Sequence, residues 1–400
     1  MRVGIITVSY LPRLGGAVTQ TLLLHKYLSS KGHQVEVFCP DLARRGRFQE
    51  DNITVNRIHN PLIRNFHGML ARIAIIHEFR RAIHSRRKDF DVFITPEFNL
   101  GPLSLCLTRG IKRIAIYGAD LTFEFLNLNR TDSIISYDDV LARKPSRLGF
   151  VNYINATMLS TVQNFMFRKL NCTVVLNPKD FERIRVQTPR LVQIGCLLEP
   201  PPFCSELEKK PRTVPQLVTI VGRAVSWKKI PESIRVAERL KEVYPHLEIH
   251  YFGTGPLMKD IEREFNDRVV MHKDLSNAQV LDWLMRSDIT VNMSDYETFC
   301  LTNCEAMLNR SLLLVKPLAA YGEYIRDQEN CVLVSNPDAP HWLKRVQESF
   351  QTGRVRTLLN TAQQTIVDQY RLEKTGAQIE QLLARTAEAQ PGLRTRRLAA

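Results

Sequence analysis

The chain opens with a strand–helix–strand pattern: VGIITVS at Val3–Ser9, AVTQTLLLHKYLSSK at Ala17–Lys31 and QVEVFC at Gln34–Cys39. Short apolar runs separated by helix-length segments are typical of parallel strands joined by crossover helices, as in an α/β fold. The alternation continues for about 190 residues of the sequence. It predicts further strands and helices at Ile53–Ile58, Ile63–His84, Asp91–Thr95, Lys112–Tyr117, Arg147–Lys169, Cys172–Leu176 and Leu191–Ile194.

This alternation stops at the proline-rich segment Glu199–Phe203 and resumes after the polar stretch Ser205–Arg212. We therefore predict two α/β domains, residues 1–200 and 201–375, followed by a C-terminal helix and basic tail, 376–400, which can pack back on the first domain. The second set of predicted elements is Leu217–Val221, Pro231–Val243, Leu247–Phe252, Arg268–His272, Asn277–Met285, Asp288–Asn292, Leu301–Asn309, Leu312–Val315, Val332–Val334, Trp342–Phe350 and Leu358–Thr386.

The composition excludes several classes of protein. With 44% hydrophobic and 24% charged residues among 400, the chain can bury a sizeable core. Its start lacks the separate charged, apolar and small-residue regions of a signal peptide, so we expect a cytoplasmic protein. The longest uncharged stretch, Leu148–Phe167, contains Asn and Gln and is not predicted to span a membrane. Eight cysteines without a Cys-x-x-Cys pair predict neither a disulfide framework nor a zinc site.

Positive charge is concentrated in the first half of the chain. Residues 1–200 hold 28 Lys and Arg against 16 Asp and Glu, a net +12 of the total +14. The segment Arg64–Lys88 carries seven of these cations against Glu78 alone, interleaved with Leu, Ile and Phe. Such a basic amphipathic helix predicts peripheral binding to an anionic membrane surface. A solvated helix face remains the alternative, and no motif indicates specific nucleic-acid binding.

Another helix-length segment, Arg147–Lys169, has apolar residues at helical spacing. They predict one buried face that packs against the sheet. Contact with a membrane is the alternative. The stripe consists of Val151, Ile154, Met158, Val162 and Phe165.

Two acidic residues follow the predicted strand Asp288–Asn292. Glu297 lies in the strand-to-helix loop, and Glu305 lies in the helix that begins near Cys300. The backbone N–H groups of Cys300, Leu301 and Thr302 have no partner within that helix, so together with the helix dipole they can bind an anionic diphosphate. Glu305 can then accept hydrogen bonds from the hydroxyls of a ribose, and Glu297 from a second sugar. A surface pair in salt bridges is the alternative.

Two more loops follow predicted strands of the second domain. Gly222, Arg223 and Lys228 lie in one loop, where both cations can converge on one anion and stabilise a leaving phosphate. Gly253 and Gly255 lie in the next loop. Ligands of open parallel sheets bind beyond the carboxyl ends of the strands, so the three loops predict one site. For Lys228 and its neighbour Lys229, an exposed lysine pair is the alternative.

Taken together, these motifs resemble the donor half of retaining nucleotide-sugar glycosyltransferases of the GT-B fold, family 4 type. The opening strand and its Gly15-Gly16 loop are similar to the first strand and glycine loop of that family. The resemblance covers about residues 1–335 and is most specific at Glu297-x7-Glu305. It implies an α/β chain with two Rossmann-like domains that face each other across a cleft.

The resemblance also implies a role for each matching residue. Arg223, Lys228 and Glu297 are the implied catalytic residues: the two cations bind the donor diphosphate and stabilise the leaving nucleoside diphosphate, and Glu297 contacts the transferred sugar. The leaving phosphate helps to deprotonate the acceptor, and neither a metal nor another cofactor is implied. The implied donor-binding residues are Gly16, Gly222, Gly253, Gly255, Cys300, Leu301, Thr302 and Glu305, and those on the acceptor side are Gly15, Tyr117 and Asp120.

The sequence departs from the family pattern at three places. Tyr117 stands where the family often has His, Cys300 stands where it has Gly, and Arg310-Ser-Leu312 replaces Gly-x-Pro. The pair Asp89-x-Asp91 is the manganese motif of another glycosyltransferase fold, but it precedes its strand and predicts no metal site.

The resemblance and the charge distribution lead to one main hypothesis and two alternatives. We expect a retaining glycosyltransferase that moves a hexose-type sugar from a nucleotide-diphosphate sugar to a hydroxyl of a lipid-linked or envelope-polysaccharide acceptor. The first alternative is the same chemistry on a soluble acceptor. The second is a non-catalytic lipid- or partner-binding module with a decayed donor site.

Overall fold

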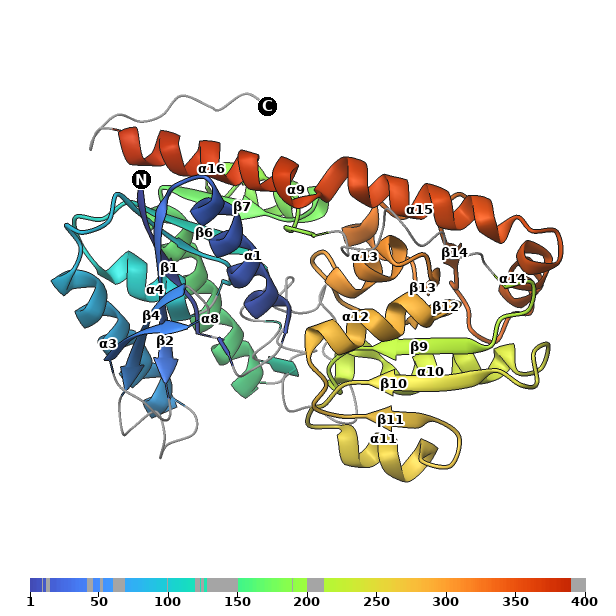
Figure 1. Cartoon of the computed structure of the whole chain (residues 1–400). Helices are drawn as coiled ribbons and strands as arrows, with labels where there is room; N and C mark the ends of the chain where they lie inside the picture. Colours follow the sequence, from blue (N-terminus) through green and yellow to red (C-terminus); the bar gives the residue numbers. More distant parts are fainter. Residues whose placement is uncertain are drawn as a thin grey trace. The chain divides into compact units, whose positions relative to one another are not determined.

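The computed structural model forms two compact units (Figure 1). It describes residues 1–8, 10–11, 15–41, 46–50, 53–59, 69–98, 100–118, 123, 126–127, 150–188, 190–199 and 212–389. Of these, unit 1 holds the residues up to 123, residues 150–197 and residues 372–389, and unit 2 holds residues 126–127, 198–199 and 212–371. Residues 201–211, around the predicted domain boundary, lie outside the described residues, as do residues 390–400 of the predicted tail.

Unit 1 is built on a mostly parallel sheet. Among the described residues it has eight strands in the order β3-β4-β2-β1-β5-β6-β7-β8, and β3 alone runs antiparallel to its neighbour. The strands β1, β5, β6 and β7 consist of nearly continuous apolar residues, as expected for strands covered on both faces. The strand bounds are β1 Arg2–Ile6, β2 Gln34–Asp41, β3 Gly46–Glu50, β4 Ile53–His59, β5 Val92–Thr95, β6 Arg113–Tyr117, β7 Cys172–Val175 and β8 Leu191–Gln193.

Helices connect these strands and cover the sheet. The last helix, α16, returns to this unit and packs against α1. At their crossing a Cβ atom on Gly376 would lie 2.5 Å from the Tyr27 ring, so only glycine permits this approach. The helix bounds are α1 Gly16–Ser30, α3 Met69–Ser85, α4 Leu100–Leu107, α8 Phe150–Lys169, α9 Pro178–Ile184 and α16 Leu372–Glu388.

Unit 2 contains a second parallel sheet. Among the described residues it has six strands in the order β11-β10-β9-β12-β13-β14, all parallel. Its core joins the buried apolar faces of the sheet, of α10 and of α14. The strand bounds are β9 Leu217–Val221, β10 Glu248–Phe252, β11 Val270–His272, β12 Ile289–Asn292, β13 Leu312–Val315 and β14 Val332–Leu333. The helix bounds are α10 Ile230–Leu240, α11 Met258–Phe265, α12 Asn277–Arg286, α13 Leu301–Leu308, α14 His341–Gln351 and α15 Val355–Tyr370.

Every strand predicted from the sequence is present, with bounds shifted by at most three residues. The sequence did not predict strand β3 or the short helices α4, α9 and α11. These helices have eight residues or fewer, too few turns for a clear helical period.

The predicted buried face of α8 is wrong. Ile154 and Met158, two of the stripe residues, are 48% and 46% exposed, whereas Ala156 and Met166 are completely buried. Val162 and Phe165 are only partly buried against the core of this unit, and the side chain of Val151 lies outside the described residues. The helix packs with a face rotated away from the stripe. The apolar pattern could not place Gln163 on the buried face, because Gln163 is polar. In the structure it is only 5% exposed.

The basic helix α3 directs its apolar residues into unit 1. Phe79 and Ile83 are buried in a cluster with Phe38 and Phe93, while Arg80 and Arg81 are exposed. Within the described side chains of the helix, residues 74–85, the outer face therefore offers positive charge. Residues 60–68, the start of the predicted helix, lie outside the described residues.

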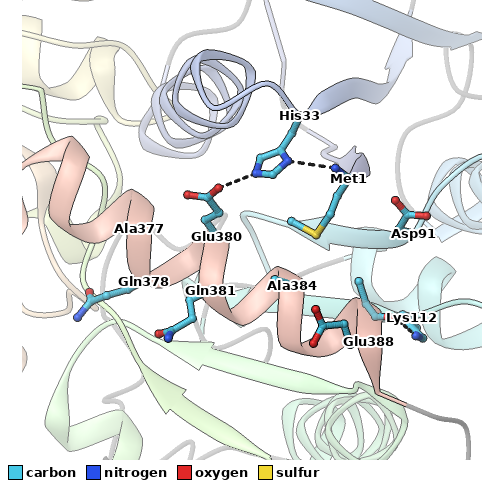
Figure 2. Close-up of a pocket in the computed structure, with 11 residues that line it drawn as sticks. Met1, His33, Asp91, Lys112, Ala377, Gln378, Glu380, Gln381, Ala384 and Glu388 are labelled. Carbon is cyan, nitrogen blue, oxygen red and sulfur yellow. Dashed lines mark hydrogen bonds and ion pairs between the residues drawn. The ribbon is translucent and has the colours of Figure 1, made fainter.

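A groove of about 900 Å³ lies along α16 at the amino ends of β1, β5 and β6 (Figure 2). On its wall the imidazole of His33 is 2.7 Å from Glu380 Oε1, and Tyr27 donates to Glu380 Oε2 at 3.2 Å. These contacts attach α16 to α1 and to the turn between α1 and β2. The groove lies at the edge opposite the carboxyl ends of the strands, where open parallel sheets bind their ligands.

Candidate functional site

Three neighbouring strands of unit 2 carry the loops of the predicted donor site. In the sheet, β9 lies between β10 and β12, and all three run parallel. Their carboxyl ends are Val221, Phe252 and Asn292, so the loops that follow emerge at one edge of the sheet. This edge is the position at which an α/β sheet presents ligand-binding side chains.

Lys228 and Glu297 are brought together at this edge. Lys228 Nζ donates to Glu297 Oε1 at 2.5 Å, and the side chains are 23% and 10% exposed. The pair joins the loop after β9 to the loop after β12. An ion pair this short and largely buried interacts more strongly than a surface pair, so the surface-pair alternative does not apply to Glu297, nor the exposed-lysine alternative to Lys228.

A second set of ion pairs lies beside the first. Asp295 accepts from Lys316 Nζ at 2.6 Å and pairs with Lys229 Nζ at 3.3 Å. The backbone N–H of Asp295 also donates to the carbonyl of Trp227 at 2.8 Å. The sequence analysis did not identify Asp295 or Lys316. Lys316 directly follows β13, and that strand-end position is the signal that could have found it.

Gly253 and Gly255 allow the loop after β10 to pack against the loop after β9. A Cβ atom on Gly253 would lie 2.0 Å from the carbonyl oxygen of Gly222, and one on Gly255 would lie 2.6 Å from that of Ala224. Ala224 N–H donates to the Thr254 carbonyl at 3.0 Å, which fixes the contact. The glycines therefore shape the loop that carries Lys228, and direct contact with a donor stays a prediction for Gly222, Gly253 and Gly255.

Glu305 lies on the second turn of α13 and is partly buried. Burial raises the pKa of its carboxyl group to about 7. Among the described residues, no side chain makes a hydrogen bond or ion pair with its carboxylate. A carboxylate in such surroundings gains most from hydroxyl donors supplied by a ligand.

Arg223 is exposed in the loop after β9, and no hydrogen bond from its side chain to a described residue is recorded. Leu301 and Thr302 form the first turn of α13, where no side chain caps the backbone N–H groups. The structure thus pairs Lys228 with Glu297, while Arg223 and Glu305 follow the neighbouring strands β9 and β12.

On the predicted acceptor side, Gly15 precedes α1 and Gly16 begins it. Gly15 has φ 153°, a conformation that side chains rarely adopt. Tyr117 is completely buried, and its hydroxyl accepts from Arg183 at 2.6 Å. The centroid of its ring lies 5.0 Å from the centroid of the Phe98 ring. The structure gives Tyr117 a packing role, and its acceptor contact stays a prediction. Asp120 lies outside the described residues.

The sequence analysis also missed Glu97, which follows β5. It is 9% exposed and accepts hydrogen bonds from the Thr7 hydroxyl, at 3.0 Å, and from the Val8 backbone. This carboxylate fixes the end of β1, from which the glycine loop departs. An acidic residue two positions after a predicted strand is the signal that could have found it.

Within the described part of the chain, two features are absent. No group of three or more His, Cys, Asp or Glu side chains in this part of the chain could hold a metal ion. None of the described helices combines the length and apolarity that a membrane span requires.

Two known protein families match parts of this chain. Residues 206–383 match the glycosyl transferases group 1, and residues 15–117 match the glycosyl transferase 4-like domain. The chain belongs to the group 1 glycosyltransferases. The first match contains the loops with Arg223, Lys228, Glu297 and Glu305, and the second contains the glycine loop of unit 1.

Individual relatives of this glycosyltransferase are distant in sequence. It is 21% identical to the α-monoglucosyldiacylglycerol synthase of Acholeplasma laidlawii over 355 residues, 82% of this chain and 84% of the relative. Its fold is similar to that of sucrose-phosphate synthase from Thermosynechococcus elongatus, with TM-score 0.71, 14% identity and coverage of 96% and 98%. It is also similar to TarM of S. aureus, with TM-score 0.71, 11% identity and coverage of 97% and 100%. The predicted α/β fold of the GT-B class, with two Rossmann-like domains, is confirmed.

The structure gives the backbone conformation at two positions where this glycosyltransferase departs from its family pattern. Cys300 and Arg310 replace glycines of the pattern and keep a left-handed backbone, with φ 68° and 56°. The Cys300 thiol is buried and accepts from Asn292 Nδ2 at 3.1 Å, and burial raises its pKa to about 12. Glycine adopts a left-handed backbone without strain, whereas other residues adopt it at a cost of about 1–2 kcal/mol per residue.

Proposed function

We propose that this glycosyltransferase transfers a hexose-type sugar from a nucleotide-diphosphate sugar, with retention of the anomeric configuration, to a hydroxyl of a lipid-linked or envelope-polysaccharide acceptor. The observation that carries the proposal is the Lys228–Glu297 pair at the carboxyl edge of the unit 2 sheet. It combines a cation for the diphosphate with a carboxylate for the sugar beside the start of α13.

The charge of the loops fits a diphosphate. The loops carry four cations, Arg223, Lys228, Lys229 and Lys316, and two carboxylates, Asp295 and Glu297, which leaves a net +2. A diphosphate in a sugar nucleotide carries two negative charges. When the bond between the donor sugar and the diphosphate breaks, further negative charge develops on the leaving diphosphate, and fixed cations stabilise this charge. We propose that these side chains take the role a divalent cation has in other transferases.

Retention is tested by the product itself. We expect NMR of the product to show the same anomeric configuration as the donor, and chelation with EDTA to leave the rate unchanged. An inverted product contradicts the retaining part of the proposal, and a rate that EDTA abolishes and Mg²⁺ restores contradicts the metal-independent part. Neither result alters the assignment of the donor loops.

A lipid-linked acceptor is supported by two observations. The relative with 21% identity is named as a synthase of a glucosyl diacylglycerol. The outer face of α3 carries exposed Arg80 and Arg81 in a chain of net charge +14. We propose peripheral binding at the cytosolic face of an anionic membrane through this face.

The test is a panel of nucleotide sugars with matched acceptors, one set lipid-anchored in vesicles and one set soluble. We expect transfer to the lipid-anchored acceptors. Transfer to soluble acceptors alone, without vesicle binding, favours the first alternative. A chain that binds no nucleotide and transfers no sugar favours the non-catalytic module.

A further inference from the structure

The loop that carries Glu297 is attached to the loop that carries Lys228 by contacts additional to the ion pair between them. Met293 N–H donates to the Ser233 hydroxyl at 3.1 Å, and that hydroxyl donates to the Lys229 carbonyl at 3.1 Å. Asp295 N–H donates to the Trp227 carbonyl at 2.8 Å. The two loops therefore form one connected structure at the edge of the sheet.

Asp295 is the residue at which these connections converge. Its carboxylate contacts Lys229 in the loop after β9 and Lys316 at the end of β13, while its backbone contacts Trp227. It is thus the described side chain that links three strand-end loops in one set of ion pairs. Asp295, Lys229 and Lys316 are 29%, 34% and 31% exposed, so the set is neither core nor open surface.

The backbone of Lys229 sets the directions of the two consecutive lysines. Its φ of 49° and ψ of 44° lie in the left-handed region, which residues other than glycine rarely adopt. This conformation turns the chain from the short 3₁₀ segment Ser226–Lys228 into α10. It directs consecutive residues Lys228 and Lys229 to different carboxylates, Glu297 and Asp295. The ion pair of Lys229 therefore helps to hold Lys228 where it meets Glu297.

We propose that Asp295, with Lys316, is a positioning residue of the transfer reaction: it fixes the Lys228 and Glu297 loops relative to each other through Lys229 and the Trp227 carbonyl. The inference rests on the proposed function of Lys228 and Glu297. Asp295 itself needs no contact with the donor. Loss of its charge removes one contact from each of two loops and leaves Lys229 and Lys316 as neighbouring cations without their shared carboxylate.

The test is Asp295→Asn in the full chain, which keeps the volume and removes the charge. We expect kcat to fall at least tenfold with a smaller rise in KM for the donor, because misplaced cations fail most where charge develops on the leaving diphosphate. The midpoint of thermal unfolding should move by less than about 3 °C, since the carboxylate is partly exposed. A merely structural role would instead lower the midpoint and leave kcat per folded molecule unchanged.

Matched variants sharpen the result. Asp282→Asn removes another aspartate of unit 2, whose ion pair with Arg286 lies on the exposed surface of α12, and should leave kcat and KM unchanged. Lys316→Met should lower kcat, Lys316→Arg should restore most of it, and the double variant Asp295→Asn/Lys316→Met should be no slower than the slower single variant.

Two contrary results separate this inference from the proposed function. An active wild-type chain with an equally active Asp295→Asn variant overturns the positioning role alone, and so do fully additive effects of the two substitutions. A wild-type chain that transfers no sugar and binds neither ADP, GDP nor UDP contradicts the proposed function, and the inference with it.

Discussion

At the scale of single residues, the site depends on one short ion pair. Glu297 is 10% exposed and has Lys228 at 2.5 Å, so removal of the cation leaves a buried carboxylate without its charged partner. We expect Lys228→Met to lower the free energy of unfolding by about 1–3 kcal/mol and to lower kcat/KM at least 100-fold. Chemical denaturation and initial rates measure the two effects.

The double variant Lys228→Met/Glu297→Gln provides the control for this pair. It has no unpaired charge, so it should recover most of the lost stability without recovering activity. If the free energy of unfolding lost in the double variant equals the sum of the losses in the two single variants, the two side chains do not interact in solution.

A second residue-scale prediction concerns pH. The carboxyl group of Glu305 has a folded-state pKa of about 7, raised by burial. Its ionised form accepts hydrogen bonds from ribose hydroxyls, so the affinity for a nucleoside diphosphate should increase as pH rises from about 6 to 8. The stability contribution has the opposite sign: a raised carboxyl pKa favours the folded state below the unfolded-state pKa, and this advantage is lost as pH rises through about 7.

Calorimetric titrations at several pH values test this dependence. In Glu305→Gln the affinity should be lower and its pH dependence should flatten. A Glu305→Gln variant with the pH profile of the unchanged chain would assign the titration to another group.

At the scale of elements, the order of strands and helices could be predicted because apolar runs and turns alternate clearly. The orientation of α8 could not, because Ile154 and Met158 fit the helical spacing of a buried stripe as well as the residues that are in fact buried. Lys228 and Glu297 were identified from their strand-end positions. Asp295 and Lys316 were not, because only the folded chain shows that Asp295 pairs with both Lys316 and Lys229.

The packing of two loops gives a prediction at the same scale. Gly253→Ala would place a Cβ atom 2.0 Å from the Gly222 carbonyl oxygen, so the loop after β9 must move. We expect a loss of about 1–3 kcal/mol in the free energy of unfolding and weaker binding of the nucleoside diphosphate. The control is Gly322→Ala, where the nearest atom lies at 3.6 Å and stability should change little.

At the scale of the whole molecule, charge should decide association with membranes. The double variant Arg80→Glu/Arg81→Glu lowers the net charge of +14 by four and reverses the charge at these two positions on the outer face of α3. We expect binding to vesicles with anionic lipids to weaken at least tenfold, and binding of the unchanged chain to weaken with added salt. Co-sedimentation measures both.

The matched control changes the same charge elsewhere. Arg263→Glu/Lys344→Glu alters two exposed residues of unit 2 and should leave vesicle binding within about twofold of the unchanged chain, a loss set by net charge alone. Equal weakening by both double variants would mean that no particular face of the molecule binds the membrane.

The central claim is that Lys228 and Glu297 belong to a site for a nucleoside diphosphate at the edge of the unit 2 sheet. Calorimetric titration of the full chain with ADP, GDP and UDP, each compared with its monophosphate, tests it most directly. We predict that at least one diphosphate binds more tightly than its monophosphate, and that Lys228→Met weakens that binding at least tenfold. Absence of binding by all three diphosphates, or equal binding by Lys228→Met, would contradict the account.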